Sequence, residues 1–344
     1  MHPALRTART CVWALVLWSA LALGPRAGAA EEDWQRAMQA GDNAFSQQNY
    51  GPALQSFEVA LREAENFGAA DRRRAETMVR LARVYRAQGD FARPEALYQQ
   101  AIDIARAAFG PETPDYARYL HEAGFYFHTR RKYDRAEEYY RTAFGIRVRV
   151  LGKEHPEVAE SLCHLGVLYE NQARSDRAEL YYKHALEIRE KVLGPDHPQT
   201  IVALEHFARL LYKLNRGVEA QPMTERAQAA RRSSIEASYS ASGSAAEGEI
   251  FRSTDAVEPP RLAERAEPDY SDEARIARQE GAVVLQADIS AEGRAGNFRL
   301  LRSLGLGLDE KAVEAVRQWE FEPARKGKQK VPFRAVLEIQ FRVL

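Results

Sequence analysis

The sequence has little cysteine, no excess of charge and few long apolar runs. Two cysteines occur, and Cys11 lies in an N-terminal segment that we predict to be removed, which leaves Cys163 as the one thiol. A single cysteine cannot form an intrachain disulfide. Lysine plus arginine and aspartate plus glutamate number 49 each. This balance argues against nucleic acid as a partner, because phosphate binding requires a basic surface.

Motifs of catalysis and metal binding are also missing. The chain has no His-Glu-x-x-His, no Cys-x-x-Cys, no glycine-rich phosphate loop and no Gly-x-Ser-x-Gly. His121 and His128 are one heptad apart, a spacing that does not converge on a metal, and His155 and His197 each precede a proline in a repeated turn, which suggests a capping role. We therefore predict that the protein is not an enzyme and has no catalytic, cofactor-binding or metal-binding residue.

The N-terminus has the pattern of a secretory signal peptide over residues 1–30. Arg6 and Arg9 precede the uncharged run Cys11–Leu23, and Ala27-Gly28-Ala29 offers a small-x-small cleavage site. The run is shorter than the roughly 20 residues that a membrane-spanning helix needs. We expect export to the periplasm. An uncleaved N-terminal anchor in the inner membrane is the alternative.

A repeat of 42 residues dominates the next part of the chain, residues 31–232. Pro114, Pro156 and Pro198 are 42 residues apart, and the last two end a Leu-Gly-x-x-His-Pro sequence. Other residues return at the same offset: Gly124 and Gly166, Phe127 and Tyr169, Tyr140 and Tyr182, and Ala143 and Ala185. A fixed period of this size indicates a repeat array.

Each unit has the pattern of two helices. Apolar residues recur at helical spacing between Pro156 and Asn171, and again between Arg177 and Val192. Small residues would let the paired backbones approach closely, and aromatic residues would fill the space between units. We expect about five helix pairs, the first and fifth being degenerate as capping repeats are.

This pattern resembles the tetratricopeptide repeat, and the 42-residue length with its Leu-Gly-x-x-His-Pro linker resembles the kinesin light chain variety. The matching residues are Leu165-Gly166, Tyr169, Ala178, Tyr182 and Ala185. The resemblance implies a right-handed superhelix whose first helices line a concave groove. Its inward positions, which would hold an extended peptide or a helix, are Arg83, Arg86, Arg118, His121, Phe125, His128, Glu160, Val167, Glu170, Asn171, Arg209 and Tyr212. The alternative is a spacer solenoid with solvated faces.

Beyond the repeats the composition changes twice. Residues 233–260 are rich in serine, alanine, glycine and glutamate and lack an apolar face, which predicts a flexible linker. Residues 261–344 then follow the order helix, strand, strand, helix, strand. Asp309 is placed to cap the second helix. The fold class is therefore a multidomain chain, an all-α solenoid followed by a small α+β domain with a three-stranded antiparallel sheet and two helices.

The last segment resembles the C-terminal domain of TonB-type energy transducers. The matching residues are Pro268-x-Tyr270, Glu280-Gly281-x-Val283-Val284-Leu285, Ser303-x-Gly305, Leu308-Asp309 and Trp319-x-Phe321-x-Pro323-Ala324. Ser271 departs from the pattern, since the family usually has proline there.

In that family the domain lies in the periplasm and binds a segment of an outer-membrane receptor as an added strand. The resemblance implies such a docking edge at Phe333, Arg334, Ala335, Val336, Leu337, Glu338, Ile339, Gln340 and Phe341. An open sheet edge offers unpaired backbone donors and acceptors. The alternative is a self-contained domain with a covered edge.

Together these features predict an exported protein-interaction adaptor that binds proteins and no nucleic acid or cofactor. One partner would lie in the repeat groove, and a second would join the C-terminal sheet. The alternative is a TonB-type energy transducer or transport accessory that contacts the membrane through an uncleaved N-terminus.

Overall fold

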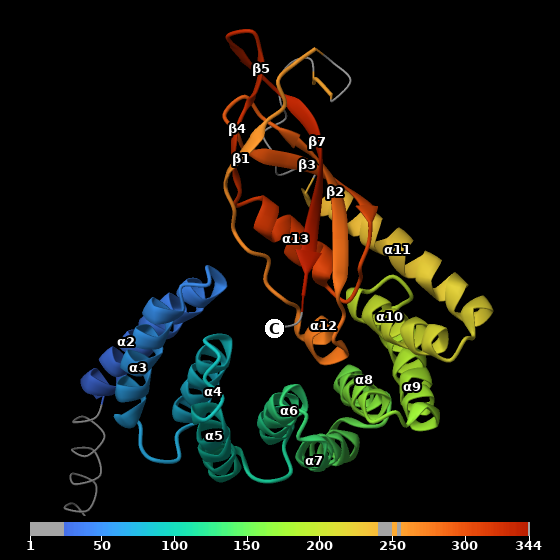
Figure 1. Ribbon diagram of the computed structural model, residues 1–344. Coiled ribbons are helices and arrows are strands. Elements are labelled where there is room, and N and C mark those ends of the chain that lie inside the picture. Colours follow the sequence, from blue (N-terminus) through green and yellow to red (C-terminus); the bar gives the residue numbers. More distant parts are fainter. Residues whose placement is uncertain (1–23, 240–249, 253–255, 343–344) are drawn as a thin grey trace, which may run out of the picture. The chain divides into compact units, whose positions relative to one another are not determined.

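The structure is a computed structural model that describes residues 24–239, 250–252 and 256–342 (Figure 1). The chain divides into two compact units. The first comprises the chain up to Gly124 together with Gly145–Val150, and the second comprises Phe125–Phe144 and everything from Leu151 onward. Most of the predicted signal peptide, residues 1–23, lies outside the described residues.

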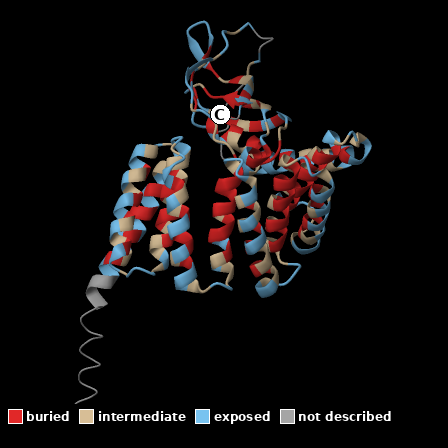
Figure 2. Ribbon diagram, turned by 60° about the horizontal axis from the view of Figure 1, so that its bottom comes forward, coloured by how far each residue is buried: buried red, intermediate tan, exposed pale blue. Residues whose placement is uncertain are grey.

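Antiparallel helices follow one another in pairs through the repeat region, which confirms the predicted two-helix unit. The helices are α2 (Gly24–Ser46), α3 (Tyr50–Glu65), α4 (Arg72–Ala87), α5 (Arg93–Phe109), α6 (Pro114–Thr129), α7 (Tyr133–Leu151), α8 (Pro156–Asn171), α9 (Ser175–Leu193), α10 (Pro198–Lys213) and α11 (Gly217–Tyr239). Helix α2 begins at Gly24, within the segment that we predicted to be removed. Buried residues, red in Figure 2, recur along these helices.

The repeated Leu-Gly-x-x-His-Pro sequence ends one helix and begins the next. Gly152 and Gly194 take φ values of 88° and 92°, a left-handed conformation that favours glycine. The Nδ1 atoms of His155 and His197 then accept hydrogen bonds of 3.2 Å from the backbone N–H groups two residues ahead. Proline follows at the first helical position, where its missing N–H costs nothing. The capping role predicted for these histidines is confirmed.

The first unit is held together by a cluster around Phe57. This side chain is buried together with Trp34, Met38, Leu81 and Val84. The indole nitrogen of Trp34 donates a 3.0 Å hydrogen bond to the hydroxyl of Thr77, so these two buried polar groups are paired.

In the second unit a glycine lets a tyrosine lie against the neighbouring helix. A Cβ atom at Gly166 would lie 2.6 Å from the ring of Tyr182, which is fully buried and donates a 2.8 Å hydrogen bond to Glu170. The repeat therefore alternates a small residue on the first helix with an aromatic residue on the second, as the sequence predicts.

We expect Gly166→Ala to destabilise the second unit by about 1–3 kcal/mol, because the tyrosine ring must move out of a packed position. Gly145→Ala is the matched control. It changes another helical glycine of the repeats, where the nearest atom to a new Cβ is the flexible end of Arg149 at 3.5 Å. The control should gain up to about 1 kcal/mol from helix propensity. Urea denaturation of both variants checks the prediction, which fails if Gly166→Ala is as stable as the control.

The C-terminal domain is a three-stranded antiparallel sheet in the order β3–β2–β7, with two helices as predicted. Its elements are β1 (Arg261–Glu264), α12 (Asp272–Ala277), β2 (Gly281–Ile289), β3 (Ala295–Arg302), α13 (Leu308–Val316), β4 (Glu320–Glu322), β5 (Ala324–Lys326), β6 (Gln329–Val331) and β7 (Phe333–Phe341). Gly281 lies opposite Phe341, and Ile289 lies opposite Phe333, so β2 and β7 pair along their full lengths.

One face of this sheet forms the core of the domain. Val283, Leu285 and Ile339 are fully buried, and α13 packs over them through Val313 and Val316. Side chains from the repeats join this core: Ile235 of α11 is fully buried in it, and Tyr239 packs edge-on against Phe298 at 6.4 Å. Helix α11 thus serves both as the last repeat helix and as a cover for β3.

Three details differ from the sequence-based predictions. Residues 233–239 continue α11 instead of starting a linker, because Ile235 has an apolar surface to pack against. Asp309 is the second residue of α13 and does not cap it; Gly307 takes the cap position. Short strand pairs, β1 with β4 and β5 with β6, were not predicted, since three- and four-residue strands carry too little periodicity to be recognised.

Candidate functional site

The predicted groove residues of the first unit are engaged with their own neighbours. Arg83 forms an ion pair with Glu122, and the guanidinium of Arg118 lies 4.7 Å from the ring of Tyr119. His121 is buried, whereas Arg86 is half-buried. Arg118 alone among these four side chains is exposed.

In the second unit half of the predicted groove residues are buried. The buried ones are Phe125, His128, Val167 and Glu170, while Glu160, Asn171 and Arg209 are half-buried and Tyr212 is exposed. Glu170 receives three partners: Tyr182, Arg209 at 2.9 Å and Lys213 at 2.7 Å. A carboxylate so fully paired has little capacity left for an incoming ligand.

Two of these residues bind the C-terminal domain. The amide nitrogen of Asn171 donates a 2.8 Å hydrogen bond to the carbonyl of Ile276, and Arg209 donates one of 2.6 Å to the carbonyl of Ala277. Both carbonyls belong to the last turn of α12, where helix carbonyls lack intrahelical partners. Positions that the sequence predicts to face a foreign peptide therefore hold this chain's own helix.

The same amide group of Asn171 also donates to Nε2 of His128, at 2.8 Å. This contact requires His128 to be neutral, because a protonated imidazole has no acceptor nitrogen. Burial lowers the pKa of His128 to about 3. His128, Asn171 and α12 are thus linked by hydrogen bonds that depend on a neutral histidine.

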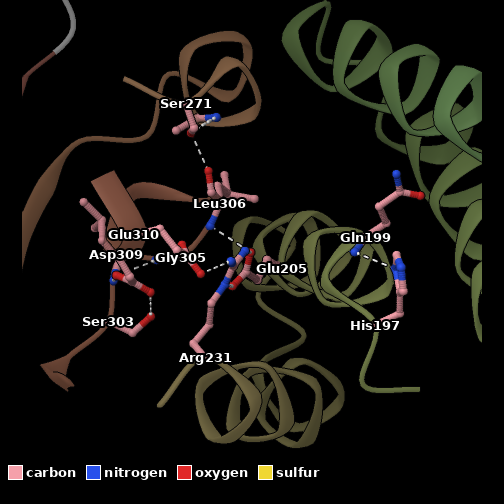
Figure 3. Close-up of polar contacts among 12 residues, drawn as sticks. His197, Gln199, Glu205, Arg231, Ser271, Ser303, Gly305, Leu306, Asp309 and Glu310 are labelled. Carbon is pink, nitrogen blue, oxygen red and sulfur yellow. Dashed lines mark hydrogen bonds and ion pairs between the residues drawn. The ribbon is translucent and has the colours of Figure 1, made fainter. Parts of the chain in front are cut away.

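A buried ionic cluster holds the domain at a second point (Figure 3). Glu205 of α10 accepts two 3.0 Å hydrogen bonds from Arg231 of α11 and a third, of 2.7 Å, from the backbone N–H of Leu306. Arg231 also pairs with Glu310 of α13 at 2.6 Å. The side chains of Arg231 and Glu205 are 8% and 11% exposed. We call Glu205, Arg231, Glu310 and Leu306 the ionic clamp.

Sequence reasoning missed the ionic clamp, although a signal was present. Glu205 occupies the repeat position that holds Val79, His121 and Cys163 in the preceding units, so a carboxylate appears where uncharged side chains precede it. A charge at such a position needs a partner.

Beside the ionic clamp, Ser271 connects α12 to the loop before α13, and Asp309 binds the backbone of the same loop. The hydroxyl of Ser271 hydrogen-bonds to the carbonyl of Leu306 and accepts from the N–H of Ala274, so it caps α12. Proline, usual in the family at this position, has no such side-chain group. Asp309 accepts from the hydroxyl of Ser303 at 2.6 Å and from the N–H of Leu304 at 2.8 Å. Burial raises the pKa of Asp309 to about 6, although the two hydrogen-bond donors act to lower it.

The edge of β7 is partly occupied. Arg334 donates its N–H to the carbonyl of Phe251 at 2.7 Å, and Phe251 donates its own to the carbonyl of Pro332 at 3.1 Å. Residues of a strand alternate in direction, so Val336, Glu338 and Gln340 also turn their backbone groups away from β2. The described residues provide no backbone partner for these three. The open part of the predicted edge is therefore Val336–Gln340, and the side chain of Val336 is 64% exposed.

In the described part of the chain, no group of three or more histidine, cysteine or carboxylate side chains could hold a metal ion. Over the same residues, no helix combines the length and the hydrophobicity that crossing a membrane would require.

Paired antiparallel helices followed by a small sheet domain define a repeat scaffold with a C-terminal module. Family comparisons agree: residues 35–107, 73–147, 122–191 and 181–233 match the tetratricopeptide repeat model, and residues 266–343 match that of the Gram-negative bacterial TonB protein C-terminal. The repeat matches extend over more than half of the sequence. The chain belongs to the tetratricopeptide repeat family.

Curated relatives match a short part of the chain. Protein TonB of Escherichia coli K12 is 32% identical over 75 residues, which are 22% of this chain and 31% of that protein. Protein TonB of Klebsiella pneumoniae is 33% identical over 69 residues, 20% of this chain and 28% of that protein. The chain thus spans less than a third of these curated relatives.

Solved structures resemble the repeats. BtubC (BKLC) from P. vanneervenii has a TM-score of 0.52 and 20% identity, covering 67% of this chain and 98% of that one. A Podosopora anserina protein with nearly identical TPR-like repeats has a TM-score of 0.50 and 20% identity, covering 60% of this chain and 97% of its own. At this identity the likeness concerns the fold alone.

Proposed function

We propose that this protein is an exported interaction adaptor whose repeats position a TonB-like domain, with the open edge of β7 as the partner-binding site. The single observation that supports this most is the arrangement of the hydrogen bonds. The ionic clamp, Asn171 and Arg209 hold the domain through its helices and the loop before α13, and none of these contacts uses Val336, Glu338 or Gln340. The edge is left open while the domain is held.

Fewer of the predicted groove residues are free to bind a foreign peptide than the sequence suggests. Helix α12 takes the concave positions Asn171 and Arg209, so a foreign peptide would have to displace it. The exposed Arg118 in the first unit and Tyr212 in the second are the predicted groove residues best placed to meet another protein. We therefore assign the docking of a second partner to the repeats, and strand addition to β7.

Partner binding at β7 can be tested by site-specific crosslinking in the native host. A photoreactive residue at Glu338, whose side chain is 55% exposed, should capture a partner that adds as a strand. Val336→Pro in the same chain should abolish the adduct, because proline removes an outward N–H that strand addition needs. It should leave the pairing of β2 with β7 intact, since that N–H points away from β2.

The matched control is Val336→Thr, which keeps the N–H and the β-branched shape. We expect the adduct to persist with threonine and to disappear with proline. An adduct that survives Val336→Pro would show that the partner contacts side chains only, and strand addition would be wrong.

A second function, energy transduction in outer-membrane transport, is favoured by the match of residues 266–343 to the TonB family. It requires residues 1–30 to be retained as a membrane anchor. The intact mass of the protein from the inner-membrane fraction separates the two. A full-length mass there supports transduction, and a periplasmic mass that begins near Glu31 supports the adaptor.

A further inference from the structure

The hairpin of β5 and β6 concentrates positive charge at one end of the C-terminal domain. Gly327 and Lys328 form its two-residue turn, and Gly327 takes a φ of 61°. Ala324 lies opposite Val331, and Arg325 lies opposite Lys330. Four of the six residues from Arg325 to Lys330 are cationic, and all six are exposed.

One face of this hairpin anchors it to the domain. Ala324 is fully buried and Val331 nearly so, in a small cluster with Phe333, against which Phe251 and Val257 pack. The backbone of Arg325 also exchanges two hydrogen bonds, of 2.9 and 3.0 Å, with Glu258. These contacts hold the hairpin in a defined position beside the start of β7.

None of the four cations forms an ion pair with another described residue. Among the described residues, no carboxylate lies within ion-pair distance of Arg325, Lys326, Lys328 or Lys330; the ammonium of Lys326 lies 4.7 Å from the ring of Phe251. Arg325 and Lys330 face each other directly across the two strands. Like charges so placed destabilise a hairpin. The pairing of Arg325 with Lys330 therefore does not stabilise the hairpin.

We propose that this hairpin binds a membrane surface rich in anionic lipid headgroups. The tip is exposed, and residues 325–330 include no apolar or aromatic side chain that could anchor in a protein partner. Three of its four charges are lysines, which act as point charges and do not form bidentate pairs. An extended surface of phosphate groups can neutralise these four charges without a pocket that matches the hairpin. Each cation contributes about 1 kcal/mol near an anionic surface.

The experiment is cosedimentation of the full chain with vesicles. One set contains phosphatidylethanolamine and phosphatidylglycerol, and the other contains phosphatidylcholine alone. Changing Arg325, Lys326, Lys328 and Lys330 together to glutamine should weaken binding to the anionic vesicles roughly tenfold or more, with little effect on the neutral ones. Raising NaCl from about 0.05 M to about 0.5 M should have a similar effect on the unchanged protein. The N-terminal segment, with Arg6 and Arg9, is the same in the variant and the unchanged protein, so comparing these two proteins removes its contribution.

The matched control changes four exposed cations of the repeats, Arg62, Arg106, Lys153 and Arg232, to glutamine, which gives the same net charge. This variant should bind as the unchanged protein does. If binding to anionic vesicles weakened equally in both variants, the binding would depend on net charge alone, and the proposal would be wrong. An absence of preference for anionic vesicles would also overturn it, as would a hairpin-dependent adduct with an acidic protein in place of lipid binding.

Discussion

Replacing Glu205 by alanine is expected to lower the free energy of unfolding of the C-terminal part of the second unit by about 3–5 kcal/mol. The change removes one carboxylate from Arg231, which is buried and pairs otherwise with Glu310, and it leaves the N–H of Leu306 without its acceptor. Breaking a buried pair is costly because the remaining charge is desolvated without compensation. The fluorescence of Trp319, which is buried in the domain core, follows the transition during urea denaturation.

Glu236→Ala is the matched control for this prediction. Glu236 lies on α11 and forms a 3.7 Å ion pair with Arg299; the two side chains are 48% and 66% exposed. An exposed pair of this kind contributes about 0–1 kcal/mol. The double change Glu205→Leu with Arg231→Met should recover much of the stability, because it removes both buried charges together. If Glu205→Ala cost no more than Glu236→Ala, the ionic clamp would not hold the domain.

Acidification is expected to destabilise both units, because neutral histidines are buried in each. Burial lowers the pKa of His121 in the first unit and of His128 in the second to about 3. Burial also lowers the pKa of His206 well below its ordinary value. The unfolded chain therefore binds more protons than the folded chain between pH 6.5 and 3. His121 and His128 each cost about 1.4 kcal/mol per pH unit below 6.5, or about 2 kcal/mol by pH 5.

Asp309 acts in the opposite direction. Its folded-state pKa of about 6 is above the ordinary value of 3.8, so the folded chain binds the extra proton between pH 6 and 4. Its contribution to stability rises by about 1 kcal/mol as the pH falls from 7 to 5. This gain in stability is smaller than the loss caused by one buried histidine. The net effect of acidification is therefore a loss of stability.

Urea titrations at pH 7.5, 6 and 5 test this account. His128→Gln should reduce the loss on acidification by about 2 kcal/mol, since glutamine retains an acceptor for Asn171 and does not titrate. Half-buried His155, which caps α8, gives a matched control, because His155→Asn keeps an N-cap acceptor at a site that is not deeply buried. A stability that stayed constant down to pH 5 would contradict a neutral, buried state of these histidines.

The period of the sequence predicts most of the fold because the same contacts recur every 42 residues. The cap at His155 and the packing of Tyr182 at Gly166 each follow from one unit and repeat in others. The helix, strand, strand, helix, strand order of the C-terminal domain was also predictable, since β2 and β7 alternate one apolar face with one polar face.

The site was less predictable, because it depends on contacts between residues far apart in the chain. Asn171 and Ile276 are separated by 105 residues, and Glu205 and Leu306 by 101. Repeat register places Asn171 and Arg209 on the concave face but does not reveal that α12 lies there. The pairing of Phe251 with the start of β7 was likewise missed, because residues 233–260 have the composition of a linker.

The central claim is that the repeats hold the C-terminal domain while the edge of β7 stays open, and residue-resolved amide hydrogen exchange of the full chain tests it most directly. We predict slow exchange at Leu306, whose N–H is bonded to Glu205, and fast exchange at Val336, Glu338 and Gln340. Glu205→Ala should accelerate exchange at Leu306 and leave the three edge amides unchanged. Fast exchange at Leu306 in the unchanged protein would contradict the holding contact, and slow exchange at all three edge amides would contradict the open edge.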